Sequence, residues 1–373
     1  MSTNAVGLDI GSTGVRAIEL SSLRKTMPVV LRSHEVALPA GAVLRGEILD
    51  GDVVSKALKK LWAQGGFKSK KVVLGVGNES VQVRELAVPK MPLKNIRESL
   101  AFHALDTAHT PVIGTLLDFY PVSEVVGERG PVINGLFVSA EKEGIAEIVK
   151  VVERAGLLPI EIELTPFALN RVLIRRPEIM GTVALIDIGG STTSVTISTN
   201  GEPVFVRMIS AGGNDVTQAL QEGLNIGPED AESRKRTLEF HRTERRQWED
   251  DELVAEATKC ECPKCISSEE TDFNPQQNEI LKTTTEELLS GLLSTVHYFN
   301  NSRAETPVSQ IILTGGGSKL AGLSGGLSQI TNLRINDVDP FSTFTFSHKK
   351  RSEVFRMDDA MTVALGLALR STQ

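Results

Sequence analysis

The sequence of 373 residues contains few cysteines and few aromatic residues, and it has no long apolar run. Its three cysteines all lie between Cys260 and Cys265, and an odd, clustered set does not form a disulfide framework. No segment supplies the roughly 18 consecutive apolar residues that a membrane-spanning helix needs. The first residues, MSTNAVGLDI, lack the basic start and apolar core of a secretory signal. These absences predict a cytoplasmic protein.

The sequence also lacks a surplus of basic residues. It has 40 Lys and Arg against 47 Asp and Glu, which gives a formal net charge of −7. Proteins that bind the nucleic-acid backbone carry the opposite balance, so we expect no nucleic-acid partner. A hydrophobic content of 40% in a chain of this length predicts a globular protein with two domains or more.

Two stretches far apart in the chain repeat one plan. The first is VGLDIGSTGVRAIEL (residues 6–20) and the second is VALIDIGGSTTSVTIS (residues 183–198). Each reads as a buried strand that ends on an aspartate, a turn of small residues, and a second alternating strand. Asp9 and Asp187 occupy equivalent points 178 residues apart. Two polar turns without a shared function are the simplest reading of either stretch alone, but the repetition favours a shared role.

Glycines in these turns let backbone N–H groups approach an anion, and the neighbouring Ser and Thr residues add hydroxyl donors. The two aspartates would repel phosphate oxygens directly. A hydrated Mg²⁺ between them resolves this conflict, because Mg²⁺ prefers carboxylate, water and phosphate oxygens as ligands. We therefore expect the two hairpins to hold a nucleotide tail from both sides.

A third glycine-rich stretch, SQIILTGGGSKLAGL (residues 309–323), predicts a strand, a turn at Gly315–Ser318 and then a helix. Bare backbone at such a turn leaves room for a flat purine ring. A tight corner without a ligand is the alternative reading.

Taken together, these motifs resemble the actin-like ATPase superfamily, in which two phosphate motifs and an adenosine motif occur in this order. Within it, the chain resembles the PilM family of type IV pilus assembly proteins, which is related to the division protein FtsA. Most of the chain carries the likeness, including LPAGAVLRGEILD, VQVRELAVPKMP, AGLLPIEIELTPFALNR, ISAGGNDVTQAL and MTVALGLALR. The resemblance implies an α/β fold with two RNase H-like lobes and an inserted α+β subdomain.

The resemblance also implies roles for individual residues. Asp9 and Asp187 would hold Mg²⁺ through water, and ATP would be the nucleotide. The implied phosphate contacts are Gly11, Ser12, Thr13, Gly189, Gly190, Ser191 and Thr192. The implied adenosine contacts are Gly315, Gly316, Gly317 and Ser318. Further residues of the cleft would be Gly212, Gly213 and Asn214, which could equally be a helix cap, and Lys235, which could equally be a solvated lysine.

Glu163 stands where relatives carry an acidic residue near the attacking water. It is the one candidate catalytic residue, as a base or as a group that positions water. An ordinary carboxylate on an edge strand is the alternative.

The cysteines form a C-x-C-x-x-C cluster of Cys260, Cys262 and Cys265. Thiolates at this spacing can bind one Zn²⁺ if a fourth ligand is found, and His241 is the nearest histidine in the sequence. Reduced thiols in a charged insert, at about residues 233–277, are the other reading.

The expected domain organisation has three parts. The first lobe would comprise residues 1–31, 160–178 and 352–373, and the second lobe residues 179–351. The inserted α+β subdomain would comprise residues 32–159.

By resemblance, the function would be that of an ATP-binding scaffold in type IV pilus assembly. It would bind the N-terminal cytoplasmic tail of a PilN-like inner-membrane protein, contact other platform components, and lie at the inner face of the membrane through its partner. ATP would act mainly as a structural or switching ligand, with weak ATPase activity at most. An FtsA-like filament and a sugar or acid kinase on the same fold are the alternatives.

Overall fold

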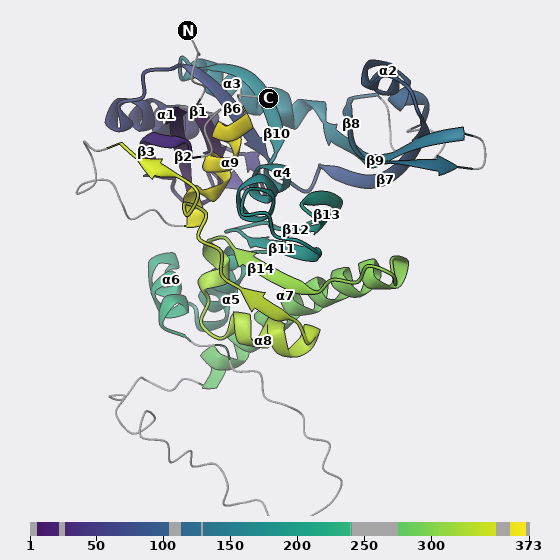
Figure 1. Cartoon of the computed structure of the whole chain (residues 1–373). Coiled ribbons are helices and arrows are strands. Elements are labelled where there is room, and N and C mark those ends of the chain that lie inside the picture. The colour runs from purple at the N-terminus through teal and green to yellow at the C-terminus, as the bar shows by residue number, and fades with distance from the viewer. Residues whose placement is uncertain are drawn as a thin grey trace, which may run out of the picture.

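The computed structural model describes residues 6–21, 27–103, 113–127, 130–238, 240, 275–347 and 359–370. Its described strands form two large sheets, a three-stranded sheet and a two-stranded hairpin. Figure 1 shows one large sheet above the other, with the smaller sheet projecting from the upper half. Within the described residues, no helix has the length and apolar character of a membrane span.

The first large sheet has the strand order β10-β6-β1-β2-β3-β16. β1, β2 and β3 are antiparallel neighbours, whereas β6 runs parallel to β1 and β10 runs parallel to β6. The bounds of these strands are β1 Val6–Ile10, β2 Gly14–Ser21, β3 Val29–Ala37, β6 Lys71–Val76, β10 Leu158–Leu164 and β16 Thr345–Phe346.

The second large sheet, β13-β12-β11-β14-β15, repeats this arrangement of three antiparallel strands followed by two parallel ones. The bounds are β11 Thr182–Ile188, β12 Thr193–Thr199, β13 Glu202–Ile209, β14 Gln310–Thr314 and β15 Arg334–Asn336. The duplication predicted from the two aspartate motifs is therefore a duplication of topology, with β1–β2 equivalent to β11–β12.

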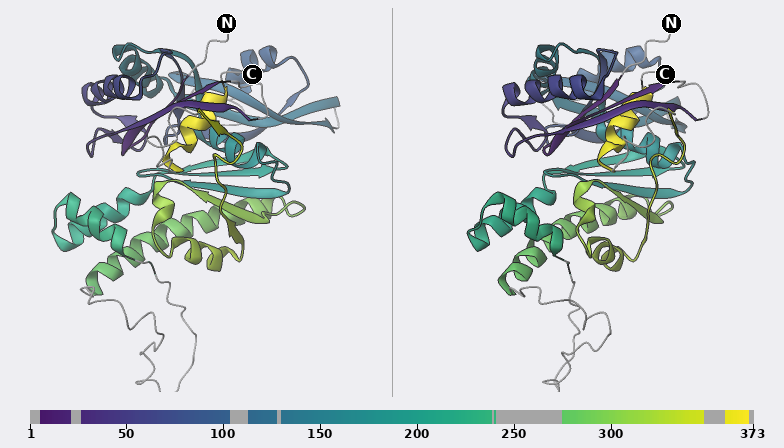
Figure 2. Two further views of the ribbon diagram at one scale, coloured as in Figure 1. Left: turned by 60° about the vertical axis from the view of Figure 1, so that its left-hand side comes forward. Right: turned by 90° about the vertical axis from the view of Figure 1, so that its left-hand side faces the viewer.

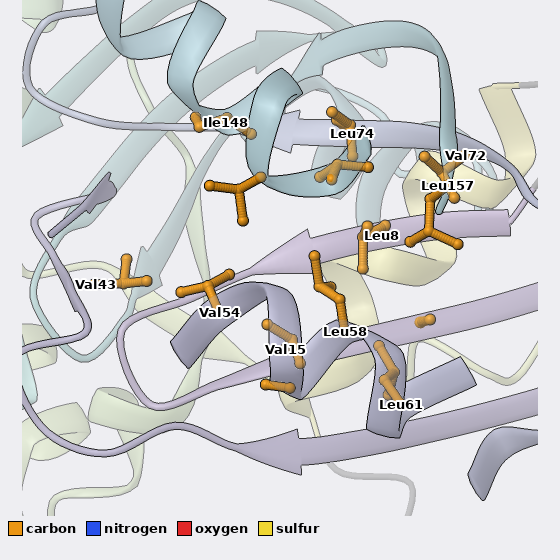
Figure 3. Close-up of a cluster of buried hydrophobic side chains, with 14 of the residues drawn as sticks. Leu8, Val15, Val43, Val54, Leu58, Leu61, Val72, Leu74, Ile148 and Leu157 are labelled. Atoms are coloured by element: carbon orange, nitrogen blue, oxygen red, sulfur yellow. The ribbon is translucent and has the colours of Figure 1, made fainter. Parts of the chain in front are cut away.

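Apolar residues on both faces of the sheets explain why helices cover them. One face of the first sheet packs on α1 (Gly51–Gly65) and α3 (Lys142–Arg154), and Figure 3 shows Leu8, Leu58 and Leu74 meeting in this core. Asp50 caps α1, because its carboxylate accepts hydrogen bonds from the backbone N–H groups of Asp52 and Val53.

Two helices fill the space between the large sheets. α4 (Thr165–Asn170) and α9 (Thr362–Arg370) belong to one buried cluster with β2 and β11. A Cβ on Gly7 of β1 would lie 2.0 Å from the carbonyl oxygen of Ala364, so α9 rests directly on the strand backbone. This close contact ties the C-terminal helix to the first sheet.

The opposite face of the second sheet is covered by helices, and one further helix packs beside them, as Figure 2 shows. The covering helices are α5 Gly213–Leu224, α7 Pro275–Ser302 and α8 Leu323–Thr331, and α6 Pro228–Thr237 packs on α5. Phe299 of α7 is fully buried in their shared core with the sheet. α5 follows β13 after a short loop, so its first turn lies near the sheet edge that carries the second aspartate.

The small sheet, β7-β9-β8, and α2 form a unit with its own apolar cluster around Phe119 and Ile96. The bounds are β7 Gln82–Pro89, α2 Leu93–His103, β8 Thr115–Gly127 and β9 Gly130–Glu141. The expected inserted subdomain, residues 32–159, also contains β6, α1 and α3, which join the first sheet and its core. We therefore propose narrower bounds for the inserted subdomain, at residues 82–141.

Candidate functional site

A cleft of about 960 Å³ is lined by residues of both large sheets. The turns after β1 and β11 meet there, together with the first turn of α5 and the loop after β14. Most of the residues singled out in the sequence line it: Asp9, Gly11, Ser12, Thr13, Asp187, Gly189, Gly190, Ser191, Thr192, Gly212, Gly213, Asn214, Lys235, Gly315, Gly316 and Gly317. Ser318 and Glu163 are not part of this lining.

The two aspartates reach the cleft through matching hairpins. Asp9 pairs with Arg16 across β1–β2, and Asp187 pairs with Ser194 across β11–β12. Each hairpin closes with the same backbone hydrogen bond: the N–H of Gly11 donates to the carbonyl of Gly14 at 3.0 Å, and the N–H of Gly189 to that of Thr192 at 2.9 Å. Both carboxylates therefore stand where a strand ends and a glycine turn begins.

The two turns touch across the cleft. A Cβ built on Gly190 would lie 2.4 Å from Ser12 Oγ and 3.2 Å from Thr13 Cγ2. Gly190 also fixes α5, because its carbonyl accepts the N–H of Asn214 at 2.6 Å. The N-terminus of α5, a 12-residue helix, therefore faces the same space as the two turns, and the positive end of its dipole favours an anion there. Its first N–H groups are engaged by the protein: those of Gly213 and Asn214 donate to the carbonyls of Gly189 and Gly190.

Removal from water dominates the electrostatics of the acidic pair. Burial raises the pKa of Asp9, an effect that the nearby Arg16 guanidinium opposes. Burial and the charge of Asp9 raise the pKa of Asp187 to about 7. The protein provides too little positive charge to neutralise these two buried carboxylates, and a cation between them would neutralise them.

Arg16 is the main positive charge beside the pair. Its guanidinium contacts Glu35 at 2.7 Å and Asp9 at 3.6 Å, and it donates to Thr13 Oγ1 at 3.1 Å. Its Nε is buried and has no hydrogen-bond partner among the described residues. Both Arg16 and Glu35 line the cleft but were not singled out in the sequence, where they read only as polar positions of alternating strands.

The loop after β14 requires glycine at position 315 for two reasons, its backbone conformation and its contact with Asp187. Gly315 has φ of +89°, and a Cβ there would lie 2.4 Å from Asp187 Oδ1. The hydroxyl of Ser318 donates to the carbonyl of Gly315 at 2.6 Å, so Ser318 closes the loop from outside the cleft. The glycine turn therefore packs against the second aspartate and leaves Gly316 open to the cavity.

Lys235 of α6 lies at the other end of the cleft. Its Nζ contacts Glu232 at 2.5 Å, Thr217 Oγ1 at 2.8 Å and the carbonyl of Gly213 at 3.1 Å. The lysine thus joins α6 to the first turn of α5. Glu232 also lines the cleft, and the sequence analysis missed it.

Glu163, the candidate catalytic residue, lies outside the lining of the cleft. Its carboxylate is buried and bound on both oxygens by Arg171, and Arg370 of α9 donates to Oε1 at 3.0 Å. Because these two arginines occupy the carboxylate and it does not line the cleft, we assign Glu163 a structural role. It joins β10 to α9.

The zinc hypothesis cannot be followed in this structure, because His241, Cys260, Cys262 and Cys265 lie outside the described residues. Within the ranges that are described, no group of three or more His, Cys, Asp and Glu side chains forms a metal site.

The raised pKa of Asp187 predicts a pH dependence of stability in Mg²⁺-free buffer. Near pH 3 and below, this carboxyl is largely protonated in the folded and the unfolded chain. Between pH 4 and 7 the folded state keeps a proton that the unfolded state releases, so the free energy of unfolding falls as pH rises. Asp187→Asn should therefore be more stable than the wild type at pH 8, by on the order of 4 kcal/mol, and close to it near pH 3.

Urea titrations of both proteins across this pH range test the prediction. A constant difference between the two proteins at all pH values would show that folding does not change the pKa of this carboxyl.

Comparison with known proteins bears on the family and the fold of the chain. Residues 7–247 match the family described as type IV pilus assembly protein PilM, and residues 184–348 match the cell division protein FtsA family. FtsA of Bacillus subtilis (strain 168) is 24% identical over 257 residues, which are 62% of this chain and 57% of that protein. The chain thus spans little more than half the length of this curated relative.

Among solved structures, a PilM–PilN type IV pilus biogenesis complex is similar over 100% of both chains, with a TM-score of 0.80 and 24% identity. MreB5 of Spiroplasma citri bound to ADP has a TM-score of 0.51 and 14% identity, over 97% of this chain and 94% of that one. These similarities confirm the predicted actin-like ATPase fold.

Proposed function

The chain belongs to the PilM family of type IV pilus assembly proteins, and from this premise we propose an ATP-dependent scaffold that binds the cytoplasmic tail of a PilN-like membrane protein. The observation that carries the nucleotide part is the contact between two acidic turns, one from each large sheet, at a single cleft. The family membership carries the partner.

The residues of the cleft fit a magnesium nucleotide. The glycine turns form a cradle that Cβ atoms would fill, and the unpaired Nε of Arg16 favours an anionic guest. Asp9 and Asp187 would hold the metal through water, and the two glycine turns, at the positive end of the α5 dipole, would hold the phosphates. When bound, the metal neutralises phosphate charge and joins the two lobes through one ligand.

ATP in this proposal stabilises one arrangement of the lobes. A ligand at a hundredfold excess over its dissociation constant contributes about 2.7 kcal/mol to the form that binds it. Because both arginines beside Glu163 engage that carboxylate, no base for rapid hydrolysis is assigned, and any ATPase activity is expected to be weak.

The edge strand β10 is our candidate docking site for the partner peptide. Among the described strands it pairs with β6 alone, and its side chains of Leu158, Ile160 and Ile162 are 52%, 47% and 37% exposed. An extended peptide can pair with such an edge through its backbone and place apolar side chains on these residues. β10 continues into α4, where the ring of Phe167 contacts the ring of Tyr120 of the inserted subdomain, with 4.7 Å between the ring centroids.

Through the PilN-like partner the protein would lie at the inner face of the membrane, beside other platform components.

A titration of peptide with and without nucleotide tests the proposal. The probe is a synthetic peptide that copies the N-terminal cytoplasmic tail of the PilN-like protein of the same organism. We expect calorimetry to show binding at least tenfold tighter with saturating Mg-ATP than with EDTA, because ATP fixes the lobes that flank the edge strand. Equal affinity in both conditions would contradict the coupling.

Ile160→Glu is the matched variant for the peptide site. It should weaken peptide binding at least tenfold and leave Mg-ATP affinity unchanged, because the side chain is exposed and remote from the cleft lining. Normal peptide affinity in this variant would exclude β10 as the docking strand.

A filament like those of FtsA is the second candidate, favoured by the match to the FtsA family over residues 184–348. Sedimentation with Mg-ATP and lipid vesicles separates the two: abundant filaments on vesicles support it, and a nucleotide-dependent peptide complex without filaments supports the scaffold. A kinase on this fold would instead release ADP when sugars or acids are supplied.

A further inference from the structure

A small hairpin from the first lobe reaches the second phosphate-type turn. It consists of β4 (Val43–Leu44) and β5 (Glu47–Ile48), joined by Arg45 and Gly46. Both turn residues have positive φ, +49° and +80°. Asparagine and glycine adopt this conformation readily in two-residue hairpins, and arginine does so rarely. A long cation at this position is therefore unusual for the turn itself.

The hairpin contacts Ser191 of the second lobe and the loop before β7 in the first. The backbone N–H of Arg45 donates to Ser191 Oγ at 3.0 Å, across the gap between the two lobes. A Cβ on Gly46 would lie 2.6 Å from the Cβ of Asn78, so the turn is seated on the loop that precedes β7. Gly46 and Ile48 also line the cleft.

The hydrogen bond to Ser191 leaves that hydroxyl ready for an anion. Ser191 accepts from the backbone of Arg45, so its own O–H proton is still available to donate. Ser191 is buried and lines the cleft. Arg45 lies at the rim of the cleft: its neighbour Gly46 lines the cleft, whereas its own side chain is directed to Glu79 outside the lining.

The guanidinium of Arg45 is held loosely. Within the part of the chain that the structure describes, it forms an ion pair with Glu79 at 3.9 Å, and both side chains are about half exposed. By contrast, Arg16 contacts Glu35 at 2.7 Å and Lys235 contacts Glu232 at 2.5 Å. A loose pair between exposed groups contributes little to stability, so Arg45 can exchange Glu79 for a stronger anion at small cost.

We propose that Arg45 senses the terminal phosphate of a bound nucleoside triphosphate. Its guanidinium leaves Glu79 and binds the added phosphate, whereas a diphosphate leaves the Arg45–Glu79 pair in place. The inference rests on the proposed nucleotide site and adds the group that distinguishes its two ligands. Charge-assisted contacts between guanidinium and phosphate are strong and directional, which suits such discrimination.

The exchange would also carry a signal out of the cleft. Glu79 accepts a hydrogen bond from Ser210 at the end of β13, and it precedes β7 of the inserted subdomain. Release of Arg45 therefore changes the charge balance on the loop between the cleft and that subdomain. The change of charge at Glu79 would thus occur next to the elements that flank the proposed peptide site.

The test compares a triphosphate with a diphosphate. Dissociation constants for Mg-AMPPNP and Mg-ADP are measured by calorimetry for wild type, Arg45→Asn and Arg45→Lys. Arg45→Asn suits the positive φ and keeps the hairpin while removing the cation. We expect it to weaken Mg-AMPPNP about tenfold and Mg-ADP less than twofold, with Arg45→Lys between wild type and Arg45→Asn for the triphosphate.

Arg97→Ala is the matched control, because Arg97 forms a similarly exposed pair with Asp118 on the inserted subdomain. It should leave both constants unchanged. Equal losses for both nucleotides in Arg45→Asn, or no loss for either, would overturn the inference. Failure of the wild type to bind either nucleotide would instead overturn the proposed function on which it rests.

Discussion

Asp187→Asn is expected to raise the dissociation constant for Mg-ATP at least a hundredfold while the protein stays folded. The substitution keeps the shape of the side chain and removes the charge that a hydrated Mg²⁺ requires. Burial and the charge of Asp9 raise the pKa of Asp187 to about 7, so its charged form destabilises the nucleotide-free protein. Removing that charge should therefore stabilise the nucleotide-free protein. Binding and stability should therefore change in opposite directions.

Asp9→Asn should weaken binding to a similar extent, since Asp9 occupies the equivalent place in the first hairpin. Calorimetric titration with Mg-ATP, paired with thermal unfolding, measures both quantities on the same samples. In wild type, EDTA should reproduce the loss of affinity, whereas in the variants it should have little further effect. Only a metal-mediated contact predicts this pattern.

Glu19→Gln is the control for loss of a buried carboxylate elsewhere. Glu19 is buried in the first sheet and receives a hydrogen bond from Arg32 at 2.8 Å. Its substitution should lower the melting temperature and leave Mg-ATP affinity unchanged. If Asp187→Asn and Asp9→Asn also bound Mg-ATP like the wild type, the two acidic turns would not be a nucleotide site.

The strands and turns of the site were predictable because the signals that form them are local. An apolar run, an aspartate and a glycine turn recur at residues 6–20 and 183–198, and each folds into the hairpin that its own residues favour. The meeting of the two turns at one cleft depends on the packing of two sheets. The repeat of the two acidic turns predicted that meeting through the chemistry of a shared Mg²⁺, and the resemblance to a known fold supported it.

Contacts between distant residues account for what the sequence missed. In PIEIEL, Glu163 has the pattern of an exposed alternating carboxylate, yet Arg370 binds it from 207 residues away. β6 also reads as an ordinary buried strand, and nothing in KVVLGV indicates that its neighbour is β1 and not β7. For this reason the narrower bounds that we propose for the inserted subdomain could not be predicted from the sequence.

Arg45 illustrates a different limit. In LRGEIL the arginine reads as a polar residue before a turn, because sequence patterns do not show that its amide reaches Ser191. A search for non-glycine residues forced into positive φ would have found it, but only once the two-residue hairpin was known.

Gly190→Val is expected to abolish measurable Mg-ATP binding, a loss of at least a hundredfold, by separating the two turns. The Cβ would meet Ser12 Oγ at 2.4 Å, Thr13 Cγ2 at 3.2 Å and Asn214 Nδ2 at 3.3 Å, so three neighbours from two lobes block it at once. Ser12 can rotate away from a single methyl group, and Gly190→Ala should therefore lose affinity only partly. The branched side chain of valine leaves no such escape.

Gly325→Val isolates this steric effect, because Gly325 lies in the same lobe and no atom approaches its Cβ position within 4 Å. It should bind Mg-ATP like the wild type, with only the small stability change that valine causes in an exposed helix. Comparing Mg-ATP affinity among glycine, alanine and valine at position 190 then tests how binding depends on the separation of the two turns. If Gly190→Val kept full affinity, the nucleotide would not lie between the lobes, and the coupling of ATP to the partner peptide would lose its physical basis.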